Sequence, residues 1–187
     1  MQTSSSPLTP VVHRGVLPAA DGDTPNWYAL YTCARHEKQV AVQLERQHFE
    51  FYLPMYASVR RWKDRRVELD LPLFPSYVFV RLALRDRVRV LSLPGAVRFV
   101  ASRGIPAPLP KDDMDRLRSG LNCGVHAEPH PYLTAGRRVR VVRGPLSGTE
   151  GILLRRKDRF RLVLSIDLIM RSVVVEVDTC DVQPLPS

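Results

Sequence analysis

The hydrophobic and polar positions of the first half of the chain change from a strand pattern to a helical one. Residues 27–32, with the sequence Trp-Tyr-Ala-Leu-Tyr-Thr, have the length and residue types of a buried strand. Between residues 35 and 47 the apolar positions Val40, Ala41 and Leu44 recur at helical spacing, while charged residues fill the opposite side. We therefore expect a strand followed by an amphipathic helix that packs on a sheet.

Two further strand patterns follow, separated by a basic segment. Residues 49–56 are aromatic but contain Pro54, which indicates a sheet edge or a break in strand pairing. Residues 59–69 resemble two strands around a charged turn, so a basic hairpin is the simplest interpretation. Residues 73–80, Leu-Phe-Pro-Ser-Tyr-Val-Phe-Val, are the most apolar stretch of the chain and predict a central strand.

Shorter signals complete the first half. The Arg-rich residues 84–92 predict a short helix, and a Pro-Gly pair then predicts a turn into a strand at residues 97–101. A last helix is expected over residues 110–117, with two aspartates at its start, where the helix dipole favours acidic groups. Helices and strands mixed in this way predict an α+β domain.

The pattern changes again in the second half. Residues 138–142, 151–154, 160–164 and 172–177 are short β-prone segments divided by Gly, Pro and charged turns, as in a small antiparallel barrel. The segment before them has no periodicity and several helix and strand breakers, which predicts a linker. We therefore expect a disordered arm at residues 1–25, an α+β domain at 26–118, a linker at 119–132 and a β-barrel at 133–187.

Composition adds one feature to this picture, a basic net charge. The chain has 28 Lys and Arg against 19 Asp and Glu, a net charge of +9. A basic surface attracts polyanions such as nucleic acid, although the same excess also serves solubility, and charge alone does not separate the two.

Several classes of protein are excluded. Cys33, Cys123 and Cys180 lie far apart without a CxxC pair, which argues against a disulfide framework or a zinc site. The histidines are dispersed and no phosphate-binding loop is present, so we expect neither an enzyme nor a cofactor. No apolar run is long enough to cross a bilayer and the first residues lack a secretory pattern, so we expect a cytoplasmic protein.

Three segments together resemble the NusG family of transcription factors, and more closely its specialised RfaH-like paralogues. The first is the aromatic strand at 27–31 with the helix that follows it. The second is Leu-Phe-Pro-Ser-Tyr at 73–77, and the third is the KOW signature at 136–151. The resemblance implies an N-terminal NGN domain, an antiparallel sheet flanked by helices, joined to a small SH3-like KOW β-barrel.

The resemblance also implies a function, that of a transcription elongation and antitermination factor. In the family the NGN domain binds RNA polymerase, bridges its cleft and suppresses pausing, while the KOW domain recruits a further partner. Such a factor acts by binding, and we expect it to be a monomer.

The polymerase contacts implied by the resemblance lie on the first domain. The residues that match the pocket for the polymerase clamp helices are Tyr31, Phe74, Pro75, Tyr77 and Phe79. Strand alternation places Tyr77 and Phe79 on one face of the sheet, and we expect helices to cover only one face, which leaves an aromatic face open. The residues that match the side facing the polymerase gate loop are Asp86, Arg87, Val88 and Arg89.

Two further surfaces are implied. Cations interleaved with an aromatic ring suit upstream or non-template DNA, through phosphate neutralisation and base stacking. The candidates are Arg35, His36, Lys38, Arg60, Arg61, Trp62, Lys63, Arg65 and Arg66. On the barrel, the loop that receives a ribosomal protein or Rho in NusG corresponds to Leu168, Ile169, Met170 and Arg171, which departs from the family's Phe-Gly-Arg triplet.

Alternative functions stay open at this point. The chain could be an RNA-binding or ribosome-associated KOW protein that uses its basic barrel alone. It could also be a general NusG that supports Rho-dependent termination. The helix-to-barrel switch of RfaH is not expected, because the β-branched runs in the second half are poor helix formers.

Overall fold

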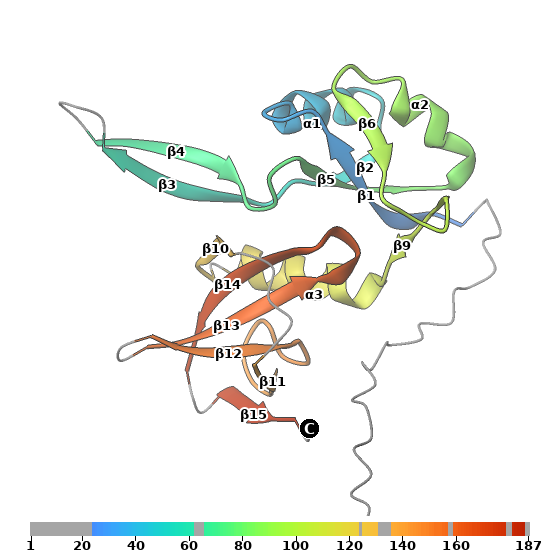
Figure 1. Cartoon of the computed structure of the whole chain (residues 1–187). Helices are drawn as coiled ribbons and strands as arrows, with labels where there is room; N and C mark the ends of the chain where they lie inside the picture. Colours follow the sequence, from blue (N-terminus) through green and yellow to red (C-terminus); the bar gives the residue numbers. More distant parts are fainter. Residues whose placement is uncertain are drawn as a thin grey trace, which may run out of the picture.

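The computed structural model places two bodies of structure against each other and describes residues 24–61, 66–123, 125–130, 136–156, 159–178 and 181–185. Figure 1 shows a first sheet with α1 and α2 on one side, and α3 with a second, barrel-like sheet on the other side. Within these ranges no helix combines the length and the apolar character needed to cross a membrane.

The first sheet is antiparallel and has β1 at its centre. Its described strands follow the order β2-β5-β1-β6, and β9 also pairs with β1. Tyr31 of β1 lies opposite Tyr77 of β5, and Asn26 lies opposite Leu82. The strands are β1 (Asn26–Thr32), β2 (Glu50–Tyr52), β5 (Tyr77–Leu82), β6 (Ala96–Phe99) and β9 (Pro108–Leu109).

One face of this sheet is covered by two helices. Helix α1 (Glu37–Arg46) and helix α2 (Arg87–Leu91) carry apolar residues that pack on alternate positions of β1 and β5. The buried residues of this layer include Tyr28, Leu30, Val40, Leu44, Val78, Val80 and Val90. The amphipathic helix predicted for residues 35–47 therefore packs on the sheet, as expected.

The other face of the sheet is also covered, which corrects the expectation of an open aromatic face. Trp27, Ala29 and Phe79 are 2%, 0% and 0% exposed, and they belong to one core with residues of α3 and of the barrel. Because these inward positions are all apolar, leaving them in water would be costly. The second half of the chain covers them.

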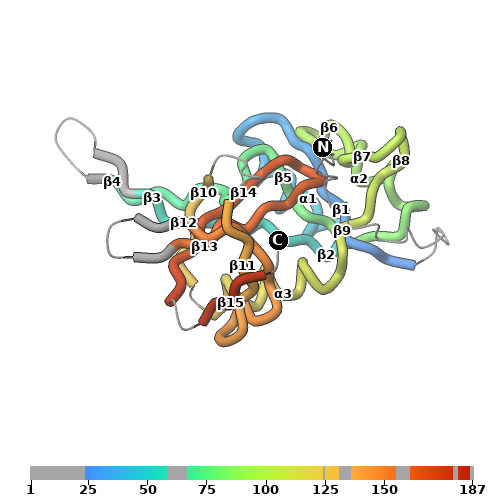
Figure 2. Tube along the Cα trace, turned by 60° about the horizontal axis from the view of Figure 1, so that its bottom comes forward, coloured from blue at the N-terminus to red at the C-terminus, as the bar shows by residue number. Residues whose placement is uncertain are grey.

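Several smaller elements connect the strands. Strands β3 (Met55–Arg61) and β4 (Arg66–Pro72) form the expected hairpin, which projects from the rest of the molecule in Figures 1 and 2. The others are η1 (Leu84–Asp86), β7 (Ala101–Ser102) and β8 (Ile105–Pro106).

The second sheet contains the expected barrel strands and two that were not expected. Its described strands follow the order β10-β14-β13-β12-β11-β15. Gly151 is required there, because a Cβ atom would lie 2.5 Å from the Val163 carbonyl oxygen. The elements are β10 (Ala127–His130), β11 (Arg137–Val141), β12 (Glu150–Arg156), β13 (Arg159–Ile166), η2 (Asp167–Ile169), β14 (Arg171–Val177) and β15 (Val182–Pro184).

The segment between the two bodies is more ordered than its pattern indicates. Helix α3 (Lys111–Asn122) continues past the expected end at residue 117, although Gly120 lowers its intrinsic helix propensity. Strand β10 lies inside the segment expected to be a linker and pairs with β14, with Ala127 opposite Val175. Tertiary pairing and packing override weak local signals here.

Arg118 fastens α3 to the first sheet. Its guanidinium donates to the Glu50 carboxylate at 3.0 Å, and lies 5.3 Å from the Trp27 ring centroid and 5.6 Å from that of Tyr52. The same carboxylate accepts a hydrogen bond from Arg81 at 3.1 Å. Helix α3 therefore belongs to the first body, and the barrel packs against both α3 and the sheet face that carries Phe79.

The half-buried Tyr52 predicts a pH dependence of stability. Burial raises the pKa of Tyr52 to about 12, with Arg118 partly opposing the shift. Unfolded tyrosine ionises near pH 10, so the folded state holds this proton more tightly and stability falls as pH rises from about 10 to about 12. Urea unfolding at pH 9, 10 and 11 should show a shallower fall for Tyr52→Phe than for the wild type. Equal slopes would contradict the partly buried environment of this phenol.

Candidate functional site

The strongest candidate site is built on a tight turn that leads into β5. The Tyr77 amide donates to the Phe74 carbonyl oxygen at 3.1 Å, which closes a four-residue turn. Pro75 occupies the second position and Ser76, with a φ of 67°, the third, as a type II turn requires. The sequence predicts a strand from residue 73, but the proline and the positive φ delay the start of the strand to Tyr77.

The turn divides the predicted clamp-helix residues into buried and accessible groups. Phe74 and Phe79 are 1% and 0% exposed, and their rings meet edge to face at 5.4 Å and 83°. Tyr31 and Tyr77 also meet edge to face, at 5.4 Å, and both are half-buried, while Pro75 is exposed. The five residues are thus brought together, but Phe74 and Phe79 are inaccessible in this arrangement.

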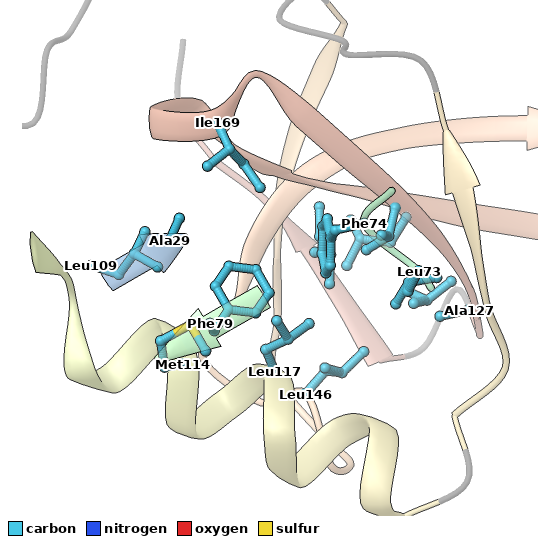
Figure 3. Close-up of a cluster of buried hydrophobic side chains, with 14 of the residues drawn as sticks. Ala29, Leu73, Phe74, Phe79, Leu109, Met114, Leu117, Ala127, Leu146 and Ile169 are labelled. Atoms are coloured by element: carbon cyan, nitrogen blue, oxygen red, sulfur yellow. The ribbon is translucent and has the colours of Figure 1, made fainter. Parts of the chain in front are cut away.

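The barrel covers the buried pair. Phe74 and Phe79 share one core with Leu164, Ile169 and other residues of β13, η2 and β14. Figure 3 shows Phe74 and Phe79 between Ile169 on one side and Leu117 and Leu146 on the other. The face that we predicted to bind a partner is therefore occupied by another part of the same chain.

The covering segment includes the predicted partner loop of the barrel. Ile169 is 4% exposed, Leu168 packs partly against the shared core, and the Arg171 guanidinium lies 5.9 Å from the Tyr77 ring centroid. Met170 has a φ of 48° and points out, with 63% of its surface exposed. The buried residues of the two predicted partner sites thus cover each other. Pro75, Met170 and Arg171 stay exposed, and Tyr31 and Tyr77 are half-buried.

A glycine in α3 forms the second contact between the bodies. Leu146, in the KOW turn, packs so closely on Gly120 that a Cβ atom there would overlap the leucine side chain. Beside this contact a groove of about 660 Å³ separates α3 from the barrel. Thr149 is among the residues that line the groove, and its hydroxyl oxygen is buried without a hydrogen-bond partner among the described residues. Helix α3 and the barrel therefore pack tightly at Gly120 and incompletely in the adjacent groove.

The predicted nucleic-acid residues lie in two places. Arg35, His36 and Lys38 are exposed around the start of α1, and Arg35 has a φ of 65°. On the hairpin, Arg61 lies opposite Arg66 in the strand register, and Arg60 precedes them. Trp62, Lys63 and Arg65 lie outside the described residues.

The predicted gate-loop residues form one short helical segment at the end of β5. Asp86 pairs with Arg89 at 3.3 Å, and the Arg89 guanidinium lies 4.8 Å from the Phe49 ring centroid. Arg87 is exposed, and Val88 is 67% exposed. Arg87, Val88 and Arg89 are therefore accessible, and Asp86 is partly buried.

Comparison with known proteins identifies the family. The model of a family described as transcription termination factor NusG matches residues 25–118, about half of the chain. This range contains α2 and the turn at residues 74–77, called the aromatic turn below. The chain belongs to the NusG family. The expected fold class, an α+β NGN domain joined to a small SH3-like KOW β-barrel, is confirmed, and the chain is a NusG-type transcription factor.

Individual NusG proteins match most of the chain. The transcription termination/antitermination protein NusG of Staphylococcus carnosus is 26% identical over 175 residues, which are 85% of this chain and 95% of that protein. The same-named protein of Helicobacter pylori is 25% identical over 166 residues, 81% of this chain and 94% of that one. A solved structure concerning the domain interaction in Thermotoga maritima NusG matches with a TM-score of 0.54 at 20% identity, over 87% of this chain and 98% of that chain, and supports the fold alone.

Sequence patterns missed the residues that join the two bodies. Gly120 resembles a helix breaker and Leu146 an ordinary turn residue, so neither indicates a contact across the chain. One signal was present: β1 and β5 are apolar on both faces, which is typical of a sheet covered on both sides.

Gly120→Ala should loosen the contact between α3 and the barrel. The added methyl group overlaps Leu146, and such overpacking costs about 1–3 kcal/mol, whereas alanine favours the helix itself. Small-angle scattering should show a larger radius of gyration than that of the wild type. Ser119→Ala, on the exposed side of α3, is the matched control, and Gly120→Ala combined with Leu146→Ala should restore the compact form. An unchanged radius for Gly120→Ala would show that Leu146 can move aside.

Proposed function

We propose that this NusG-family protein binds RNA polymerase through the aromatic turn of its first domain and acts as an elongation and antitermination factor. The observation that carries the proposal is the cluster of four aromatic rings on and around the turn at residues 74–77, within the range matched by the family. Large rigid rings bury much apolar area at low conformational cost, as binding hot spots require. The resemblance assigns this face to the polymerase clamp helices.

The proposed action on transcription is a shift of population. The aromatic turn would hold one side of the polymerase cleft, and the exposed Arg87 and Val88 of α2 would reach the gate loop on the other. A factor that binds the closed clamp more tightly than the open one depopulates open, paused states. Its effect is therefore limited by the difference between its two affinities.

Binding at this face requires the barrel to move. Phe74 and Phe79 lie beneath Ile169 and its neighbours, so polymerase and barrel would compete for the same apolar surface. The apparent dissociation constant then equals the intrinsic one divided by the fraction of molecules that are open. We propose that residues 26–118 form the polymerase-binding unit and residues 133–187 the barrel. Within the segment 119–132, the end of α3 belongs with the first unit and β10 with the barrel, so the tether is the chain between them.

A contact with DNA is part of the same proposal. The hairpin of β3 and β4 projects from the body, and its strand ends carry Arg60, Arg61 and Arg66. Exposed Arg35 and Lys38 add charge near α1. A projecting basic ribbon reaches phosphates without moving the domain, so we assign it to upstream or non-template DNA.

The barrel would bind a further partner through the loop at residues 168–171. Movement of the barrel would expose Ile169 and Leu168 next to Met170, an apolar group suited to a ribosomal protein or Rho. Because this loop lacks the Phe-Gly-Arg triplet, we propose a specialised paralogue and not a general NusG. A Rho-dependent termination assay separates the two, since a general NusG would stimulate termination.

Ile169→Asp should strengthen polymerase binding about tenfold. A carboxylate in the shared apolar core is costly, so the variant favours the open form and raises the competent fraction. Binding of the full chain to core polymerase can be measured by fluorescence anisotropy, with circular dichroism to verify the barrel. Met170→Asp is the control, because that side chain is already exposed. Gly120→Ala should also strengthen polymerase binding, and it leaves the barrel sequence unchanged. Weaker binding by both Ile169→Asp and Gly120→Ala would contradict the idea that polymerase and barrel compete for one surface.

Tyr77→Ala should weaken polymerase binding about tenfold or more, because it removes a half-buried ring from the proposed contact. Tyr77→Phe keeps the ring and should bind nearly as well as the wild type. The comparison is best made in the Gly120→Ala background. There the barrel is already loosened in every variant, so differences in affinity report the contact with polymerase and not the release of the barrel. Unchanged binding of Tyr77→Ala would remove the turn from the interface. Absence of polymerase binding by the wild type would instead favour an RNA-binding or ribosome-associated KOW protein.

A further inference from the structure

A buried carboxylate lies directly behind the aromatic turn. Glu37, the first residue of α1, is only 5% exposed. Its Oε1 atom accepts a hydrogen bond from the Ser76 amide at 2.7 Å, across 39 positions of sequence. Glu37 lies in the first turn of α1, a position that favours acidic side chains. A charged group is rarely buried unless it is paired, and here its partner is the backbone of the turn.

Ser76 needs this support because of its conformation. Its φ of 67° lies in the left-handed region, which is unfavourable for a residue with a Cβ atom and is usually occupied by glycine at this position of a type II turn. The Ser76 carbonyl oxygen also accepts from the Thr32 amide at 2.9 Å. The peptide groups of Ser76 are thus fixed by α1 on one side and by β1 on the other.

We propose that Glu37 is a positioning residue that holds the turn in the form in which Phe74 and Tyr77 present their rings to polymerase. The inference rests on the proposed function. Ser76 is flanked by Tyr77 and lies two residues after Phe74, so a change in its φ would redirect both aromatic side chains. Glu37 itself lies behind the turn, on the side of α1. It would make no direct contact with polymerase and would act only by fixing the conformation of the turn.

The energetic role of Glu37 is preorganisation. A turn that is already ordered in the free protein loses less conformational entropy on binding than one that must be ordered by its partner. Removing the carboxylate would let Ser76 relax toward negative φ, and polymerase binding would then have to restore the turn. The loss should appear as weaker affinity at temperatures far below unfolding, where a contribution to stability alone has no effect.

The experiment measures the affinity of full-length variants for core RNA polymerase, together with their thermal unfolding. Glu37→Ala should bind about tenfold more weakly, and Glu37→Gln, whose amide oxygen still accepts a neutral hydrogen bond, should lose less. Adding Ser76→Gly to Glu37→Ala should restore affinity, because glycine adopts positive φ without help. Adding Ser76→Ala should not restore it. Glu45→Ala, on the exposed side of α1, is the matched control and should bind like the wild type.

The barrel must be considered in this series, because it rests on the same turn. A loosened turn could also release the barrel and mask the loss, so each variant is compared in the wild-type and Gly120→Ala backgrounds. If Glu37→Ala fails to fold, Glu37→Gln and the Glu37→Ala, Ser76→Gly double variant decide the question. Equal binding by the wild type and Glu37→Ala, or rescue by Ser76→Ala as good as by Ser76→Gly, would overturn the proposal. If the wild type itself does not bind polymerase, the proposed function fails and this inference fails with it.

Discussion

The burial of the second face of the first sheet is the interaction on which the rest of this structure depends. Trp27, Ala29 and Phe79 are apolar on a face that α1 and α2 do not reach. A sheet that is apolar on both faces must be covered on both, and neither α3 alone nor the barrel alone completes the cover. The two together produce one core that extends from the aromatic turn to Ile169, and this core sets how the two halves of the chain are placed.

This arrangement gives one surface two uses. The features that make the turn a good partner site, rigid aromatic rings on an apolar face, also make it a good site for the barrel. The internal contact is not uniform: Leu146 packs tightly on Gly120, while a groove beside this contact separates α3 from the barrel. An interface with such a gap gives up part of the packing energy of a continuous core, which favours separation when a competing partner is present.

Local patterns predicted most elements and failed where the tertiary contacts are strongest. The helix at Val40, Ala41 and Leu44 and the barrel strands follow from periodicity alone. The end of α3 and the position of β10 do not, because Gly120 is tolerated for its contact with Leu146 and β10 is held by the free edge of β14. The candidate residues were nominated by motif, yet which of them reach the surface depends on residues almost a hundred positions away.

By itself, the sequence of this protein determined its α+β and barrel halves, its family and the cluster of aromatic residues at 74–79, since these depend on local periodicity, turn chemistry and motif. Only the tertiary structure decided that Phe74 and Phe79 are covered and that Ile169 lies in the same core. It also decided that Glu37 supports Ser76. The physical reason is that burial and hydrogen bonding across long separations depend on the relative placement of elements, which no local pattern encodes.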